Sequence, residues 1–221
     1  MSVTVYQNYI NGAFTASQEH LDVFNPANGE LLAKVPAASA EEVDQAFAAA
    51  RAAQKDWARK PAIERAGYLR QIAQLIRANA PALARTITLE QGKINALAEV
   101  EASFTADYLD YMAEWARRIE GEVISSDRAN EQIFLLRKPL GVVAGILPWN
   151  FPFFLIARKM APALITGNTT VIKPSEETPN NCFEFARLVA QTDLPPGVFN
   201  VVSGDGRVGA GMTANGQADM I

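Results

Sequence analysis

The sequence has very few of the residues that form disulfides and metal sites. It contains one cysteine and one histidine among 221 residues. The single cysteine, Cys182, has no partner for an internal disulfide, which is typical of a protein from a reducing compartment. We therefore expect a cytoplasmic protein without a metal site.

Long apolar runs and an excess of basic charge are missing as well. The most apolar stretch, 140–156, is interrupted by Pro148, Asn150 and Pro152, so it is too short and too broken to span a bilayer. Residues 1–18 lack the basic and apolar segments of a secretory signal. The net charge of −4 favours neither nucleic acid nor an anionic membrane as a partner. Small molecules or other protein chains are the expected partners.

The apolar content is 49%, which is enough to bury a large core. In the first 35 residues, the pairs Asn11-Gly12 and Asn28-Gly29 separate short apolar runs and predict two small hairpins. Ser39, with Glu42 three residues later, is typical of a capping box at the start of a helix. Helices are expected over residues 39–60, 61–79, from 81 onward, and over 95–118.

From residue 141 onward, short apolar runs alternate with amphipathic segments. Strands are expected over 141–147, 169–172 and 198–202, and helices over 153–165, 180–191 and 207–214. The predicted fold class is therefore α/β: a Rossmann-like parallel sheet with flanking helices, preceded by N-terminal hairpins and helices. Residues 218–221 look like the opening of another strand, so we expect the sheet to be incomplete at its C-terminal end.

The segment Pro148-Trp149-Asn150-Phe151-Pro152 lies between a predicted buried strand and a helix, where open α/β sheets bind ligands. The side-chain amide of Asn150 can donate a hydrogen bond there to a developing oxyanion. Alternatively, Asn150 only caps the helix or the Pro152 turn. Position alone leaves both interpretations open.

The segment Lys173-Pro174-Ser175-Glu176 follows the next predicted strand. A lysine and a carboxylate three residues apart can both reach one ribose, with Glu176 accepting hydrogen bonds from its hydroxyls and Lys173 donating. The alternative is an ordinary surface ion pair, with Ser175 or Thr178 capping the next helix.

A third segment, Gly204-x-Gly206-x-x-Gly209, matches the dinucleotide-binding fingerprint between a strand and a helix. The match is weak, because that fingerprint normally belongs to the first strand of such a sheet and is followed by an acid about twenty residues later.

Cys182 falls in the first turn of a predicted helix, a position that lowers the pKa of a thiol. The one histidine, His20, lies in a remote hairpin, at a polar tip where we expect it to be solvated. We therefore expect Cys182 to be structural rather than catalytic.

Taken together, three segments resemble the aldehyde dehydrogenase superfamily in their order and spacing. They are 148–152, 173–176 and the run Pro195-Pro196-Gly197-Val198-Phe199-Asn200-Val201-Val202. Two further stretches, 104–108 and 111–116, look like the lactaldehyde and glycolaldehyde dehydrogenase branch. The resemblance covers essentially the whole chain and implies NAD-dependent oxidation of a small hydroxyaldehyde to the acid.

The resemblance also implies roles for single residues. Asn150 would be the oxyanion-hole amide, Trp149 would help form the nicotinamide pocket, and Lys173 with Glu176 would hold the adenosine ribose. A carboxylate at Glu176 would repel a 2′-phosphate, so the expected cofactor is NAD rather than NADP. The expected cofactor-binding residues are Ile146, Leu147, Pro148, Trp149, Lys159, Lys173, Ser175, Glu176, Gly206 and Gly209.

The resemblance implies a division of the chain. Residues 1–120 and 140–221 would form a truncated NAD-binding domain, and 121–139 an oligomerisation arm. We therefore expect a homo-oligomer or association with a complementing fragment. The family's catalytic domain, with its nucleophilic cysteine and general-base glutamate, would be absent, so these 221 residues alone are expected to be inactive. The alternative is a non-catalytic module for NAD binding or subunit association.

Overall fold

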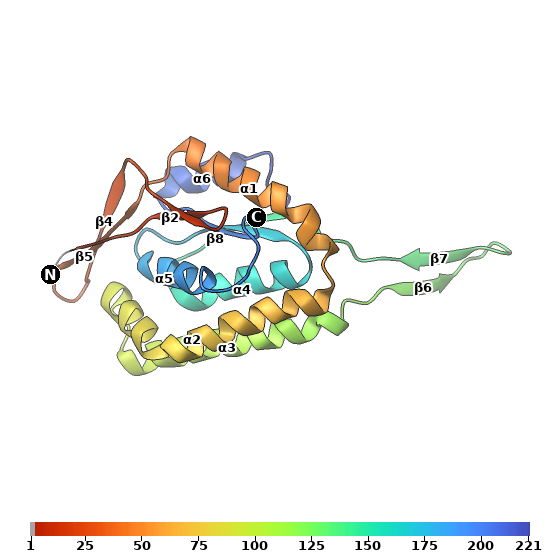
Figure 1. Cartoon of the computed structure of the whole chain (residues 1–221), viewed down its shortest axis with the longest axis horizontal. Helices are drawn as coiled ribbons and strands as arrows, with labels where there is room; N and C mark the ends of the chain where they lie inside the picture. The colour runs from red at the N-terminus through yellow and green to blue at the C-terminus, as the bar shows by residue number, and fades with distance from the viewer. Residues whose placement is uncertain (1–2) are drawn as a thin grey trace.

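A five-stranded sheet forms the centre of the computed structural model, which describes residues 3–221 (Figure 1). The strand order is β3-β2-β10-β9-β8. The strands are β2 (Asn8–Ile10), β3 (Ala13–Thr15), β8 (Val142–Ile146), β9 (Thr169–Lys173) and β10 (Phe199–Val201). β8, β9 and β10 run parallel to one another, as the alternating pattern predicts.

The first N-terminal hairpin belongs to this sheet rather than only preceding it. β2 pairs antiparallel with β10, and β3 pairs antiparallel with β2 at the edge of the sheet. Asn11 and Gly12 connect β2 to β3 with φ angles of 53° and 78°, as a tight hairpin turn requires. The sheet is therefore mixed, with a parallel centre and an antiparallel edge.

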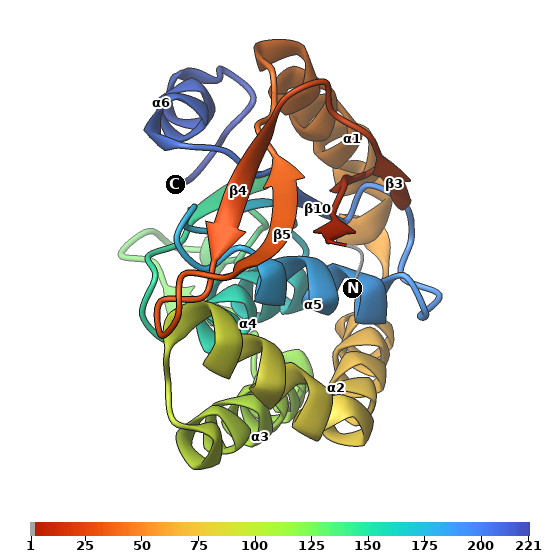
Figure 2. The same ribbon diagram turned by 90° about the vertical axis from the view of Figure 1, so that its left-hand side faces the viewer.

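The second predicted hairpin is part of a separate three-stranded sheet (Figure 2). β4 (His20–Phe24) pairs antiparallel with β5 (Leu31–Pro36), and β1 (Thr4–Val5) pairs parallel with β5. His20 is exposed, as expected, but its predicted place at a hairpin tip is wrong. It begins β4 opposite Pro36, at the open end of the hairpin, because the turn lies near Gly29.

The helices form layers on both sides of the central sheet (Figures 1 and 2). α1 (Ala40–Arg59) and α6 (Gly206–Ala214) cover one face, and α4 (Pro152–Ile165) and α5 (Asn180–Val189) cover the other. α2 (Ala62–Gln91) and α3 (Asn95–Ala113) pack outside α4 and α5 as a third layer. α3 continues into a short 3-10 turn, Glu114–Arg117, so the helix predicted to reach residue 118 ends in a tighter coil.

The predicted capping box at the start of α1 is confirmed. The Ser39 hydroxyl accepts a hydrogen bond from the Glu42 amide at 3.3 Å, and the Glu42 carboxylate accepts one from the Ser39 amide at 2.7 Å. At the other end, the Trp57 indole donates to the Leu164 carbonyl at 3.1 Å. α1 is therefore fixed at its start by its own sequence and at its end by α4.

The prediction of a helix break between residues 79 and 81 was wrong. α2 is 30 residues long and continues without a break through Pro81. An internal proline costs a helix about 3 kcal/mol, because it removes a hydrogen bond and crowds the preceding turn. Buried residues on both sides of the proline offset this cost: Leu69, Ile72, Ala73 and Ile76 before it, and Leu83, Ala84 and Ile87 after it.

Between α3 and β8 the chain forms a two-stranded ribbon that projects from the body (Figure 1). It consists of β6 (Glu122–Ser125) and β7 (Gln132–Leu135), and all eight of their residues are exposed. Apolar side chains are among them, including Phe134 with 62% of its surface exposed. The structure thus has an extended arm within residues 121–139, and its pairing with another subunit stays a prediction.

The last residues lie beside β8 in the orientation of a further parallel strand. Met220 pairs with Val143 in a parallel β-bridge. Two backbone hydrogen bonds form it: the Asp219 amide donates to the Val142 carbonyl at 2.9 Å, and the Ala144 amide donates to the Met220 carbonyl at 2.8 Å. The Asp219 carboxylate also accepts hydrogen bonds from the Val142 amide at 2.7 Å and from the Arg51 guanidinium at 2.6 Å. The predicted strand opening is therefore confirmed.

Among residues 3–221, no helix combines the length and the apolar character needed to cross a membrane.

A glycine is required where Asp219 docks. Gly141 has φ +137°, and a Cβ at this position would lie 1.9 Å from a carboxylate oxygen of Asp219. We predict that Gly141→Ala lowers the free energy of unfolding by about 1 to 3 kcal/mol, because the new methyl displaces Asp219 and strains the backbone. Urea unfolding followed by circular dichroism measures the loss. Gly216→Ala is the matched control, since a Cβ there meets no atom within 4 Å; equal effects of the two changes would contradict the prediction.

Candidate functional site

The segments 148–152, 173–176 and 195–202 meet where the parallel strands β8, β9 and β10 end, which is the carboxyl edge of the central sheet. Ile146 at the end of β8 is in register with Lys173 at the end of β9, and Ile172 is in register with Val201 of β10. The Leu147 amide extends the pairing by donating to the Lys173 carbonyl at 2.9 Å. Because parallel strands end on the same side, this edge is where an open α/β sheet binds its ligand.

Lys173 and Glu176 form an ion pair at this edge with very different exposure. The Lys173 side chain is 3% exposed, and its ammonium lies 3.3 Å from Glu176 Oε2 and 3.1 Å from the Pro174 carbonyl oxygen. The Glu176 side chain is 41% exposed. A buried lysine therefore orients a carboxylate that remains open to a ligand, which differs from the pair of two exposed residues that the sequence allowed as an alternative.

Ser175 and Thr178 do not cap the next helix, so that part of the alternative was wrong. The Ser175 hydroxyl accepts from the Glu177 amide at 3.3 Å, and its carbonyl accepts from the Thr178 amide at 3.3 Å, which closes a local turn. α5 begins only at Asn180 and has no side-chain cap from its preceding residue.

The glycine-rich segment places the start of α6 against the same edge. Asp205 caps α6 by accepting a hydrogen bond from the Arg207 amide at 2.8 Å. Gly206 is exposed, and no atom lies within 4 Å of a Cβ built on it. A Cβ on the buried Gly209 would lie 3.9 Å from side-chain atoms of both Ile146 and Lys173. α6 thus packs against the ends of β8 and β9 at Gly209, at a distance where a Cβ would make ordinary van der Waals contact.

The turn formed by residues 148–151 is largely open to solvent. Trp149 is 60% exposed, and Asn150 and Pro148 are also exposed, whereas Leu147 is buried beneath them. Within residues 3–221, the Asn150 side chain has no hydrogen-bond partner. Phe151, not Asn150, precedes the first residue of α4, and it caps no amide with its side chain. The alternative in which Asn150 caps the helix was therefore wrong, and its amide is free for a ligand.

Lys159 is an exposed residue of α4, and its Cβ lies close to β8. A Cβ built on Gly145 would lie 3.4 Å from the Lys159 Cβ, so the lysine leaves the helix close to the strand that ends at Ile146. The structure therefore brings all ten predicted cofactor-binding residues and Asn150 to one end of β8, β9, β10 and the helices that follow them.

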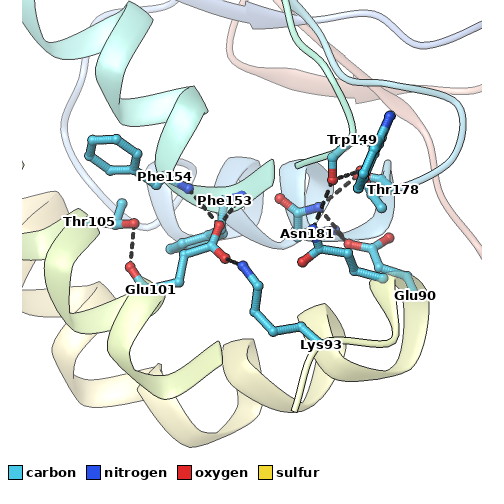
Figure 3. Close-up of polar contacts among 10 residues, drawn as sticks. Glu90, Lys93, Glu101, Thr105, Trp149, Phe153, Phe154, Thr178 and Asn181 are labelled. Carbon is cyan, nitrogen blue, oxygen red and sulfur yellow. Dashed lines mark hydrogen bonds and ion pairs between the residues drawn. The ribbon is translucent and has the colours of Figure 1, made fainter. Parts of the chain in front are cut away.

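Two buried carboxylates that the sequence interpretation missed cap the helices behind this edge (Figure 3). Glu101 accepts hydrogen bonds from the Phe153 and Phe154 amides at 2.9 and 3.1 Å, at the start of α4. Glu90 accepts from the Asn180 and Asn181 amides at 2.7 and 2.9 Å, at the start of α5. The side-chain oxygens of both residues thus satisfy backbone amides that have no partner within the helix.

A signal for both acids was present in the sequence. Glu90 continues the apolar spacing of Leu83 and Ile87 on the buried side of α2, and Glu101 falls between Ala98 and Thr105 on the buried side of α3. A charged residue within an apolar stripe is rarely buried without a partner, so each position indicated a specific contact with another element.

Burial also changes the acid–base properties of this region. Desolvation raises the pKa of Glu90 to about 7, although the side-chain and backbone N–H groups of Asn181 and the backbone N–H of Asn180 oppose the shift. Cys182 is completely buried, and desolvation raises the pKa of its thiol well above the usual range. The helix N-terminus therefore does not lower the thiol pKa, and the complete burial of Cys182 agrees with the expected structural role.

A cavity borders this edge at the start of α6, through Asp205, Arg207 and Val208. It has a volume of 740 Å³, lies between the starts of α1 and α6 and is lined by acidic residues that include Glu19, Glu41 and Asp44. It contains neither Asn150 nor the Lys173–Glu176 pair. The described residues contain no group of three or more histidine, cysteine, aspartate or glutamate side chains that could hold a metal ion.

The fold and the three strand ends define a class of protein. Residues 14–221 match the model of the aldehyde dehydrogenase family, and the chain belongs to that family. It is similar to the lactaldehyde dehydrogenase of Escherichia coli (strain K12), with 54% identity over 225 residues, which cover 100% of this chain and 47% of that protein. The chain spans about half the length of the curated relatives it matches.

Solved structures agree with this assignment. A structure titled lactaldehyde dehydrogenase has a TM-score of 0.96 at 53% identity and covers 98% of this chain and 46% of its own. A structure of 3,6-anhydro-L-galactose dehydrogenase in complex with NAP has a TM-score of 0.94 at 40% identity and covers 97% and 46%. The succinate-semialdehyde dehydrogenase (NADP(+)) of Escherichia coli (strain K12) is 42% identical over 95% of this chain and 44% of that protein.

The raised pKa of Glu90 makes a prediction about stability. The folded state keeps the proton up to about pH 7, whereas an ordinary glutamate loses it near 4.5, so the stability that this group contributes is lost as the pH rises between those values. For the wild type we predict a decrease on the order of 3 kcal/mol in the free energy of unfolding between pH 5 and 8. In Glu90→Gln, which cannot titrate at this position, that decrease should be absent.

Urea unfolding at several pH values between 5 and 8 measures this difference between the wild type and the variant. Glu177→Gln is the control, because that carboxylate is exposed near the start of α5 and is not among the groups that shift the pKa of Glu90. Parallel pH profiles for the wild type and Glu90→Gln would show that Glu90 does not hold the proton.

Proposed function

We propose that these residues bind NAD and supply the oxyanion-stabilising amide of an enzyme that oxidises a small hydroxyaldehyde, such as lactaldehyde or glycolaldehyde, to the acid. The observation that carries the proposal is the arrangement at the sheet edge. The unpartnered Asn150 amide and the Lys173–Glu176 pair lie at the ends of neighbouring parallel strands. The similarity to lactaldehyde dehydrogenase supports this substrate class.

Glu176 is the basis for preferring NAD to NADP. Its carboxylate is half-exposed and is oriented by the buried Lys173 ammonium, so it can accept hydrogen bonds from both hydroxyls of a ribose. A phosphate on the 2′-oxygen would bring a second negative group against it, which is unfavourable. Because relatives include an NADP(+) enzyme and a complex with NAP, the cofactor choice is not a property of the fold alone.

Asn150 has the role of stabilising charge in this proposal. When a nucleophile adds to the aldehyde, the carbonyl oxygen becomes negative, and a fixed amide donor lowers the energy of that state. Bound NAD supplies the acceptor for the hydride. The nucleophile is not Cys182, the one cysteine of the sequence, because it is buried and its thiol pKa is raised. We therefore propose that these 221 residues alone bind the cofactor without turning over an aldehyde.

A second candidate function is subunit association without catalysis. The projecting arm favours it, because Val123, Phe134 and Leu136 expose apolar surface on a ribbon whose outer strand edges are free to pair. The two candidates are compatible, since an NAD-binding chain with such an arm would associate through it.

The cofactor proposal predicts a specific loss of affinity. Isothermal titration calorimetry is expected to show NAD binding more tightly than NADP, and Glu176→Gln is expected to weaken NAD about tenfold, because the neutral amide accepts more weakly from the ribose hydroxyls. Glu177→Gln, at the neighbouring exposed carboxylate, is the matched control and should leave the affinity unchanged. Equal affinity of the wild type and Glu176→Gln would refute the ribose assignment, and aldehyde-dependent NADH formation by the purified chain would refute the proposed inactivity.

The arm predicts an oligomer that depends on its apolar residues. Phe134→Asp is expected to reduce the molar mass measured by light scattering after size exclusion, because a charge replaces an apolar side chain that the proposed partner subunit would bury. Asp127→Asn, at the exposed tip of the ribbon, should leave the mass unchanged. A wild-type chain that elutes as a monomer at high concentration would contradict the proposed role of the arm.

A further inference from the structure

The open turn that carries Asn150 is contacted by the end of α2 and by the connection between α2 and α3. The Gln91 side-chain amide donates a hydrogen bond to the Trp149 carbonyl at 3.1 Å. The Lys93 ammonium lies 4.2 Å from the centre of the Phe151 ring. Residues on both sides of Asn150 are thus contacted by a segment about sixty positions earlier in the chain.

The same lysine also forms the ion pair that completes the cap of α4. Lys93 pairs with the Glu101 carboxylate, which accepts the Phe153 and Phe154 amides. The Glu101 side chain is fully buried, and that of Lys93 is 13% exposed, so the pair is shielded from solvent and salt. One end of the turn is fixed through Phe151, and the helix that follows the turn is fixed through Glu101.

The sequence of the turn does not stabilise this conformation by itself. Phe151 has φ 49°, a left-handed conformation that costs a non-glycine residue on the order of 1 to 3 kcal/mol. Phe151 also provides no side-chain cap for α4. Contacts from outside the turn compensate for the backbone strain and for the missing cap. Gln91 binds the Trp149 carbonyl, and Lys93 lies over the Phe151 ring. Glu101 accepts the first free amides of α4.

We propose that Gln91, Lys93 and Glu101 form a positioning clamp that holds the 149–151 turn, and with it the Asn150 amide, at the cofactor edge. This inference rests on the proposed function, in which the turn borders the nicotinamide end of NAD. The three residues touch no reacting atom. They act through Trp149, Phe151 and α4.

Lys93→Met is the decisive variant. Methionine keeps an apolar side chain of similar length but removes the cation from the Phe151 ring and from Glu101, while Glu101 can still cap α4. Lys93→Arg retains the charge and should restore the wild-type behaviour. Lys55→Met is the control, because Lys55 is an exposed lysine of α1 and forms no ion pair among residues 3–221.

The first readout is a comparison of NAD with ADP by calorimetry. ADP carries the adenosine ribose that Lys173 and Glu176 would hold but lacks the nicotinamide. We expect Lys93→Met to weaken NAD about tenfold and to leave ADP unchanged. Equal weakening of both ligands would overturn the clamp, since it would show a general loss of structure.

The second readout does not depend on cofactor binding. In protein labelled with 5-fluorotryptophan, the ¹⁹F resonance of Trp149 should shift or broaden in Lys93→Met and recover in Lys93→Arg, while those of Trp57 and Trp115 stay in place. An unchanged Trp149 resonance would overturn the clamp. If the wild type binds neither NAD nor ADP, the proposed function fails, and the fluorine spectrum alone decides whether the clamp exists.

Discussion

The capping of α4 and α5 by buried carboxylates is the interaction on which the site depends. Glu101 from α3 and Glu90 from α2 each accept two backbone amides at the start of a helix that follows a central strand. Neither helix has a side-chain cap from its own preceding residue. The outer helical layer therefore does more than cover the core, because it sets where the two helices begin and where the loops before them lie.

Those loops contain the chemical groups of the candidate site. The chain leaves β8 through an exposed turn with a free Asn150 amide, and it leaves β9 through a turn in which the buried Lys173 orients Glu176. α6 packs against both strand ends at Gly209. A rigid sheet thus places the groups, and the short loops keep Asn150 and Glu176 exposed, as the proposed function requires.

Local patterns predicted most of this architecture, and long-range contacts account for what they missed. Alternating apolar runs located β8, β9 and β10 with their helices, and the Ser39–Glu42 spacing located the start of α1. The apparent break at Pro81 failed because packing on both sides of the proline outweighs its local cost. Each candidate segment was expected next to the end of a strand, and the structure has these strand ends side by side. The caps were missed because Glu101 meets the Phe153 amide 52 positions later and Glu90 meets the Asn180 amide 90 positions later.

A crystal structure of the chain grown with NAD tests the central claim most directly. We predict density for the adenosine ribose with both hydroxyls within hydrogen-bond distance of the Glu176 carboxylate, and with the nicotinamide end toward Trp149 and Asn150. Two results would contradict the account. One is a nucleotide bound elsewhere, such as beside Glu19, Glu41 and Asp44 in the cavity between α1 and α6. The other is no nucleotide at the ends of β8 and β9 at saturating NAD.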